Sequence, residues 1–96
     1  MTVRKDEVTV DLRGVATPEE LQAQLMKLLD FPGWYGMNWN AFWDAITGLV
    51  EMPLRLRFVG WADFELRQPF SANQLRECLS QMQTELPTLA AAVSYE

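Results

Sequence analysis

The side chains best suited to chemistry are concentrated in residues 31–53, FPGWYGMNWNAFWDAITGLVEMP. Three of the four tryptophans lie here, mixed with polar side chains behind a Pro-Gly loop. Tryptophan and tyrosine present a large contact area with few torsions to fix, which is why they dominate binding hot spots. The aspartate and two asparagines among them can pair with cations and exchange hydrogen bonds. This mixture is poor core material, and it predicts a recognition surface.

The spacing of these residues predicts two stripes if residues 38–48 form a helix that ends at Gly48, a favourable C-terminal glycine. An apolar stripe, expected to face the core, consists of Trp39, Phe42, Ile46 and Val50. A second stripe, with spacing i, i+3, i+4, i+7, consists of Asn40, Trp43, Asp44 and Thr47. Folding does not require tryptophan beside aspartate and threonine on an outward face. The second stripe therefore predicts a binding face, with Trp43 nearest to the core boundary.

Catalytic and metal chemistry have few candidates in this chain. It has no histidine and one cysteine, Cys78, so histidine-based triads are excluded and zinc or copper sites are not expected. Cys78 is expected to pack as a small hydrophobic side chain on a helix. The best enzyme hypothesis pairs the carboxylates of Asp44 and Glu51, which share a face only if the helix continues past Gly48. No cofactor is expected, and a binding protein is the favoured class.

Several short motifs keep a fixed order across this segment: Pro32, Trp34-Tyr35-Gly36, Asn38, Ala41-x-Trp43-Asp44, Thr47-Gly48, Val50-Glu51 and Pro53-Leu54. In this order the chain resembles the barstar family, small intracellular inhibitors of bacterial ribonucleases. The match is dense over about a quarter of the chain, and elsewhere only the order of elements agrees. An aromatic-aromatic-Gly loop, a Trp-Asp pair and a Thr-Gly turn at fixed spacing form a specific combination, whereas a lone Trp-Asp pair is weak evidence.

The resemblance implies that the second stripe docks into the active site of a bacterial ribonuclease or nuclease toxin in a one-to-one complex. Asp44 matches the family's central carboxylate, which takes the place of a substrate phosphate, and Trp34 supplies an aromatic contact from the loop. The implied partner-binding residues are Trp34, Tyr35, Gly36, Asn38, Asn40, Trp43, Asp44, Thr47, Gly48, Glu51 and Glu85.

The chain also departs from the family pattern. Asn40 stands where the family has a second helix carboxylate, and Leu49 stands where it has an aromatic residue after Thr-Gly. Gln81 replaces one of two acidic residues on the last helix. Asn40 and Gln81 each remove one negative charge, although Asn40 can still form hydrogen bonds. These departures indicate the same binding face tuned to a ribonuclease other than barnase.

The elements that must position this face are predicted from hydrophobic periodicity and capping. Residues 7–12 alternate as a strand, and a helix starts at Thr17-Pro18-Glu19-Glu20 and runs to about residue 29. After a loop over residues 30–37 and the 38–48 helix, a second strand opens at Pro53, with alternate residues from Leu54 facing inward.

The C-terminal part predicts a short helix over residues 61–68, a helix capped by Ser71 and stopped by Pro87, and a strand over residues 88–95 covered on both faces. Arg55 and Arg57 are expected on a solvated face where they discourage edge pairing. Strands separated by helices predict an α/β fold. The resemblance implies three mostly parallel strands and about four helices.

Length and charge limit the remaining possibilities. Ninety-six residues are expected to form a single domain, residues 1–96. No apolar run approaches a membrane span, and the charged N-terminus lacks a signal-peptide core, so a cytoplasmic protein, monomeric when free, is expected. The net charge of −5 is compatible with simple solubility or with steering toward a basic partner, and it argues against nucleic-acid binding. An alternative left open is an adaptor that uses the same face on a non-nuclease protein.

Overall fold

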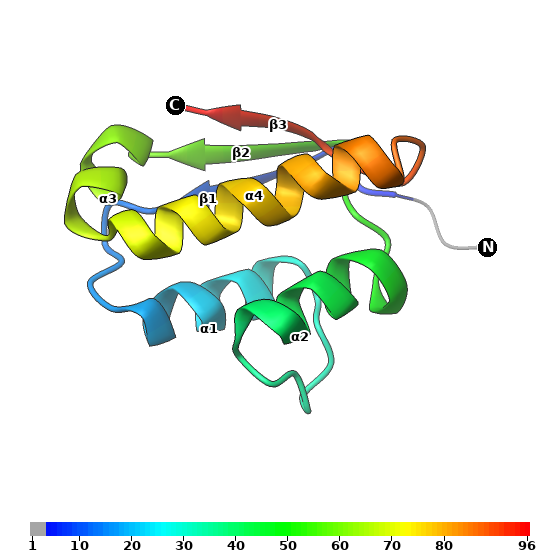
Figure 1. The fold of residues 1–96 in the computed structure, drawn as a ribbon, viewed down its shortest axis with the longest axis horizontal. Coiled ribbons are helices and arrows are strands. Elements are labelled where there is room, and N and C mark those ends of the chain that lie inside the picture. Colours follow the sequence, from blue (N-terminus) through cyan, green and yellow to red (C-terminus); the bar gives the residue numbers. More distant parts are fainter. Residues whose placement is uncertain (1–3) are drawn as a thin grey trace.

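The computed structural model describes residues 4–96, which form a three-stranded parallel sheet with helices packed beneath one of its faces (Figure 1). The strands are β1 (Glu7–Asp11), β2 (Arg55–Val59) and β3 (Ala92–Tyr95). The helices are α1 (Pro18–Leu28), α2 (Trp39–Asp44), α3 (Trp61–Arg67) and α4 (Pro69–Glu85). A π-helical turn, η1 (Ala45–Leu49), continues α2. The predicted α/β class with parallel strands and four helices is confirmed.

The sheet has the order β1-β2-β3, with Val8 opposite Leu56 and Val10 opposite Phe58. These four side chains are buried, as the alternating pattern predicts, and they face the helices. Leu54 was expected to face inward with them, but it is 47% exposed and precedes the strand, which begins at Arg55.

Two expectations about the strands are wrong, the first because the strand order places β2 in the centre. Arg57 does not guard an edge; its guanidinium lies 2.8 Å from Glu96 and 3.7 Å from Glu7, on the strands at either side. The last strand is not covered on both faces, because the helices pack on one face of the sheet (Figure 1); in β3, Ala92 is exposed and the other side chains are partly buried.

Local chemistry accounts for the starts of both α1 and α4. Thr17 caps α1 by accepting a hydrogen bond from the Glu20 amide at 3.1 Å, as predicted. The last helix was expected to be capped by Ser71, but α4 already starts at Pro69, and Ser71 is buried in its first turn. Proline is well suited to the first helical position because its missing N–H has no partner there in any case.

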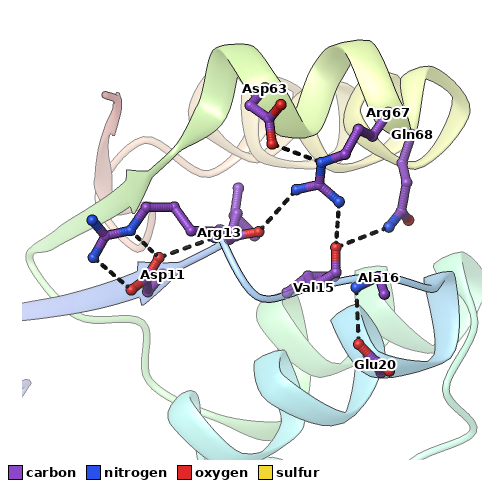
Figure 2. A network of polar contacts seen from close by, with 9 residues as sticks. Asp11, Arg13, Val15, Ala16, Glu20, Asp63, Arg67 and Gln68 are labelled. Carbon is purple, nitrogen blue, oxygen red and sulfur yellow. Dashed lines mark hydrogen bonds and ion pairs between the residues drawn. The ribbon is translucent and has the colours of Figure 1, made fainter.

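A polar network fixes the loop between β1 and α1 against α3 (Figure 2). The Arg67 guanidinium donates to the carbonyl oxygens of Val15 at 2.6 Å and Leu12 at 3.3 Å, and it pairs with Asp63 at 2.7 Å. The charged donors thus satisfy part-buried backbone acceptors and tie this loop to α3, at a distance from α2 (Figure 1).

Candidate functional site

The loop before α2 presents one aromatic side chain to solvent and buries the next. Trp34 is 73% exposed, whereas Tyr35 is 6% exposed and packs on Phe31 with ring centroids 4.7 Å apart. The Tyr35 hydroxyl donates to the buried Gln22 amide oxygen of α1, and burial raises the pKa of the phenol well above its usual value. Tyr35 therefore lies beneath the surface on which it was expected, and it anchors the loop that projects Trp34.

Gly36 and Asn38 shape the turn into α2. A Cβ added at Gly36 would lie 3.3 Å from the Ala41 Cβ and 3.3 Å from the side-chain nitrogen of Asn38, closer than most contacts that real Cβ atoms make. The Asn38 side chain caps α2, since its oxygen accepts from the Ala41 amide at 2.7 Å and its nitrogen donates to the Gly36 carbonyl at 3.2 Å. Both polar atoms of Asn38 are thus used within the chain.

The outward stripe of α2 lies close to where the sequence predicts it. Asn40 and Asp44 are exposed, whereas Trp43 and Thr47 are partly buried. The Thr47 hydroxyl donates to the Trp43 carbonyl at 2.6 Å, one helical turn back. Within residues 4–96, Asp44 forms neither a hydrogen bond nor an ion pair, so its carboxylate is available to a ligand.

Trp39 was expected to be core, but it is only partly buried and its ring meets Phe42 edge-on at 5.5 Å. The residues of this segment that are fully buried are Phe42, Ala45 and Ile46. The buried stripe therefore includes Ala45 and is centred further round the helix than the apolar pattern suggests. Trp39 lies at the flank of that stripe.

A groove of about 410 Å³ runs between α2 and α4. On the α2 side it is lined by Trp39, Asn40, Trp43 and Asp44, and on the α4 side by Gln74, Cys78 and Gln81. The α4 residues have the spacing i, i+4, i+7, so they share one face of that helix. This spacing could have identified Gln74 from the sequence as a residue of the groove. Asp44 carries the only charge among these lining residues. We call this cavity the α2–α4 groove.

Two of the α4 residues have distinct environments. Cys78 is partly buried, and burial raises the pKa of its thiol, which keeps it protonated and poorly nucleophilic at neutral pH. Gln81 donates to the Glu85 carboxylate at 2.5 Å, and Glu85 is exposed. Cys78 therefore contributes shape, as expected, and Glu85 places a carboxylate beyond the groove's end.

The stripe ends in a π-helical turn, and the helix does not continue to residue 51. The Val50 amide donates to the Ala45 carbonyl at 3.1 Å, after which the chain is extended. Gly48 and Glu51 are exposed. Asp44 lines the α2–α4 groove, whereas Glu51 lines other cavities. The two carboxylates therefore do not share a cavity, and this geometry gives no support to a paired-carboxylate active site.

Charge is unevenly distributed around these residues. Residues 28–54 and 77–96 contain no lysine or arginine, so α2, η1 and the last turns of α4 carry no cation of their own. In the part of the chain that the structure describes, Asp44, Glu51 and Glu85 belong to no ion pair, whereas Asp11, Asp63 and Glu96 do. The surface around α2 is therefore acidic, with uncompensated carboxylates.

No helix within residues 4–96 is long and apolar enough to cross a membrane. Nor do these residues gather three or more metal-ligating side chains of the histidine, cysteine or acidic type at one place.

Comparison with known proteins is consistent with this geometry. The sequence model of the Barstar family, described as "barnase inhibitor", matches residues 6–94. A protein of Bacillus subtilis (strain 168), named "Putative ribonuclease inhibitor YrdF", is 35% identical over 82 residues, which cover 82% of this chain and 87% of that protein. On both grounds the chain belongs to the Barstar family, whose members are inhibitors and not enzymes.

Proposed function

We propose that this protein inhibits a bacterial ribonuclease by forming a one-to-one complex that occludes the active site. The observation that carries the proposal is the uncommitted Asp44 carboxylate, held on α2 next to aromatic side chains on an acidic surface. Family membership and the name of the Bacillus subtilis relative support the same function. An immunity protein of this kind meets its ribonuclease inside the producing cell, so we place it in the cytoplasm.

The chemical basis is substitution of a substrate phosphate by a protein carboxylate. A site that binds a phosphodiester presents cationic hydrogen-bond donors, and a carboxylate can accept charge-assisted hydrogen bonds from them. Asp44 has no partner to give up within residues 4–96, so its pairing with such donors breaks no interaction of the free chain. The exposed Trp34 indole, 73% accessible, can occupy space where a nucleotide base would stack.

The other predicted contacts contribute in two ways. Asn38, Gly36 and Tyr35 hold the loop and the start of α2, so that less conformational freedom is lost when the partner binds. Asn40, Trp43, Thr47 and Gly48 extend the contact along α2 and η1, while Glu51 and Glu85 add negative charge at the periphery. Peripheral charges act mainly on the association rate, by steering a basic partner toward the acidic surface.

The test is RNA cleavage by a panel of purified secreted bacterial ribonucleases, barnase among them, with rising amounts of the wild-type protein. We expect complete inhibition of at least one ribonuclease at a molar ratio of one. Cleavage that continues in a tight complex contradicts occlusion of the active site and favours docking elsewhere. Absence of binding to every ribonuclease of the panel contradicts the proposed function.

A further inference from the structure

A second and larger groove, of about 620 Å³, lies between η1 and the loop that joins α4 to β3. These two segments are at the same end of the molecule (Figure 1). Its apolar lining comprises Ile46, Leu49, Val50, Met52 and Leu89. Leu49 is 44% exposed and Leu89 is 51% exposed, one on each side. We call this cavity the η1 groove.

Arg4 holds the two sides of the η1 groove together. Its guanidinium donates to the carbonyl oxygens of Met52 at 2.7 Å and Pro53 at 3.1 Å on one side. On the other side it donates to those of Thr88, Leu89 and Ala90, each at 3.2 Å. Because one planar group satisfies acceptors of the chain that follows η1 and of the α4–β3 loop, the groove is preformed in the free chain. A preformed apolar site binds at a smaller cost in conformational entropy.

The π-helical turn exposes the apolar side of this groove. Ala45–Leu49 has a wider turn than an α-helix, so Leu49 projects outward instead of joining the buried stripe of Phe42 and Ile46. Single π turns occur frequently at functional sites. Thr47 and Gly48 line this groove and also belong to the proposed docking face, so the two surfaces are continuous.

The charge of the η1 groove indicates the chemistry of its occupant. Glu51 lines it and takes part in no ion pair or hydrogen bond within residues 4–96. Arg4, the basic residue of the lining, has its donors directed at backbone carbonyls, and no other cation lies in residues 28–54 or 77–96. The lining therefore holds one cation and one anion, but only the Glu51 carboxylate has hydrogen-bonding atoms without a partner within residues 4–96. An apolar depression with such a carboxylate favours an apolar side chain next to a lysine or arginine.

We propose that the η1 groove is a second subsite of the docking surface, which receives an apolar side chain from a basic surface loop of the ribonuclease. This inference rests on the proposed function. It assigns binding roles to Leu49 and Leu89, and a positioning role to Arg4, which acts by holding the groove open.

Two variants change the groove without touching α2. Leu89→Ala removes one apolar side, and Thr88→Trp places bulk at a groove residue whose side chain is exposed and whose carbonyl remains free to accept from Arg4. Each is expected to raise the Kd for the ribonuclease that the wild type inhibits by about tenfold, mainly through faster dissociation. Leu66→Ala is the matched control, because Leu66 is 83% exposed on α3, and its Kd is expected to stay within about twofold of wild type.

The measurement is surface plasmon resonance against each ribonuclease of the panel, with Asp44→Ala in parallel and circular dichroism melting of every variant. If Asp44→Ala weakens binding while Leu89→Ala and Thr88→Trp do not, the η1 groove is no subsite and the proposed function stands. If the groove variants weaken binding only as much as Leu66→Ala, the inference is equally wrong. If the wild type binds no ribonuclease, the proposed function and this inference fail together.

Discussion

Removal of the Asp44 carboxylate tests the proposed docking face most directly. Asp44 is exposed at the junction of α2 and η1, and its side chain forms no capping hydrogen bond. It also forms no ion pair within residues 4–96. Substitutions at exposed positions without such contacts change the free energy of unfolding by about 0.5 kcal/mol or less. Asp44→Ala should therefore leave the melting temperature close to that of the wild type.

The effect on binding should be much larger. A hydrogen bond to a charged group contributes about 1.5–3 kcal/mol, and its loss leaves the partner's cations buried without a counter-charge. We expect Asp44→Ala to cost at least about 2 kcal/mol of binding free energy, or about 30-fold in Kd. Isothermal titration calorimetry with the inhibited ribonuclease measures this cost. Glu19→Ala, which removes one exposed carboxylate on α1, is the charge-matched control and should change Kd only slightly.

Two results would refute this reasoning. An Asp44→Ala variant that binds as tightly as Glu19→Ala would show that the carboxylate does not face a cationic site. A melting temperature that falls together with affinity would show that Asp44 supports the fold, in contrast to its exposed and unpartnered position.

Three further expectations follow from the same structure. Phe42→Ala should destabilise the fold by about 3–5 kcal/mol, and Trp39→Ala by clearly less, because Phe42 is fully buried and Trp39 is not; urea unfolding compares them. Asn40→Asp should weaken binding, because a new carboxylate that faces a pocket matched to asparagine loses its water without gaining a partner. Stopped-flow measurement of the association rate at two salt concentrations tests this, and a variant that binds faster and more tightly would contradict it. The hydrogen bond from Arg57 holds the pKa of the Glu96 carboxyl at about 2, below its usual 4.5. The stability that this pair adds is therefore complete above pH 4.5 and is lost as the pH falls toward 2. Glu96→Gln should flatten the acid side of a plot of unfolding free energy against pH, and an unchanged plot would argue against this role of the pair.

Much of the local structure could be predicted from the sequence, because it depends on neighbouring residues. The alternation of Val8, Thr9 and Val10 predicts β1, and Thr17 followed by Pro18 predicts the start of α1. The outward stripe with Asn40 and Asp44 also lies where helical spacing puts it, since rotation per residue is a property of the helix itself.

What the sequence left undecided depends on contacts between segments far apart in the chain. The strand order makes β2 central, and only this order brings Arg57 between Glu7 and Glu96. Tyr35 packs on Phe31 in the core, and Gln22 of α1 gives its buried hydroxyl a partner, which the neighbouring residues of the loop cannot reveal.

The two grooves also depend partly on local sequence and partly on contacts between distant segments. Helical spacing places Asp44 and Trp43 on one side of α2, but the α2–α4 groove exists only because α4 packs alongside and contributes Gln74 and Cys78. The η1 groove requires Arg4, near one end of the chain, to hold carbonyls of residues 52–53 and 88–90 together. Periodicity and capping act over a few residues and can be read from the sequence, whereas burial and groove shape arise when distant elements pack, so only the tertiary structure decides them.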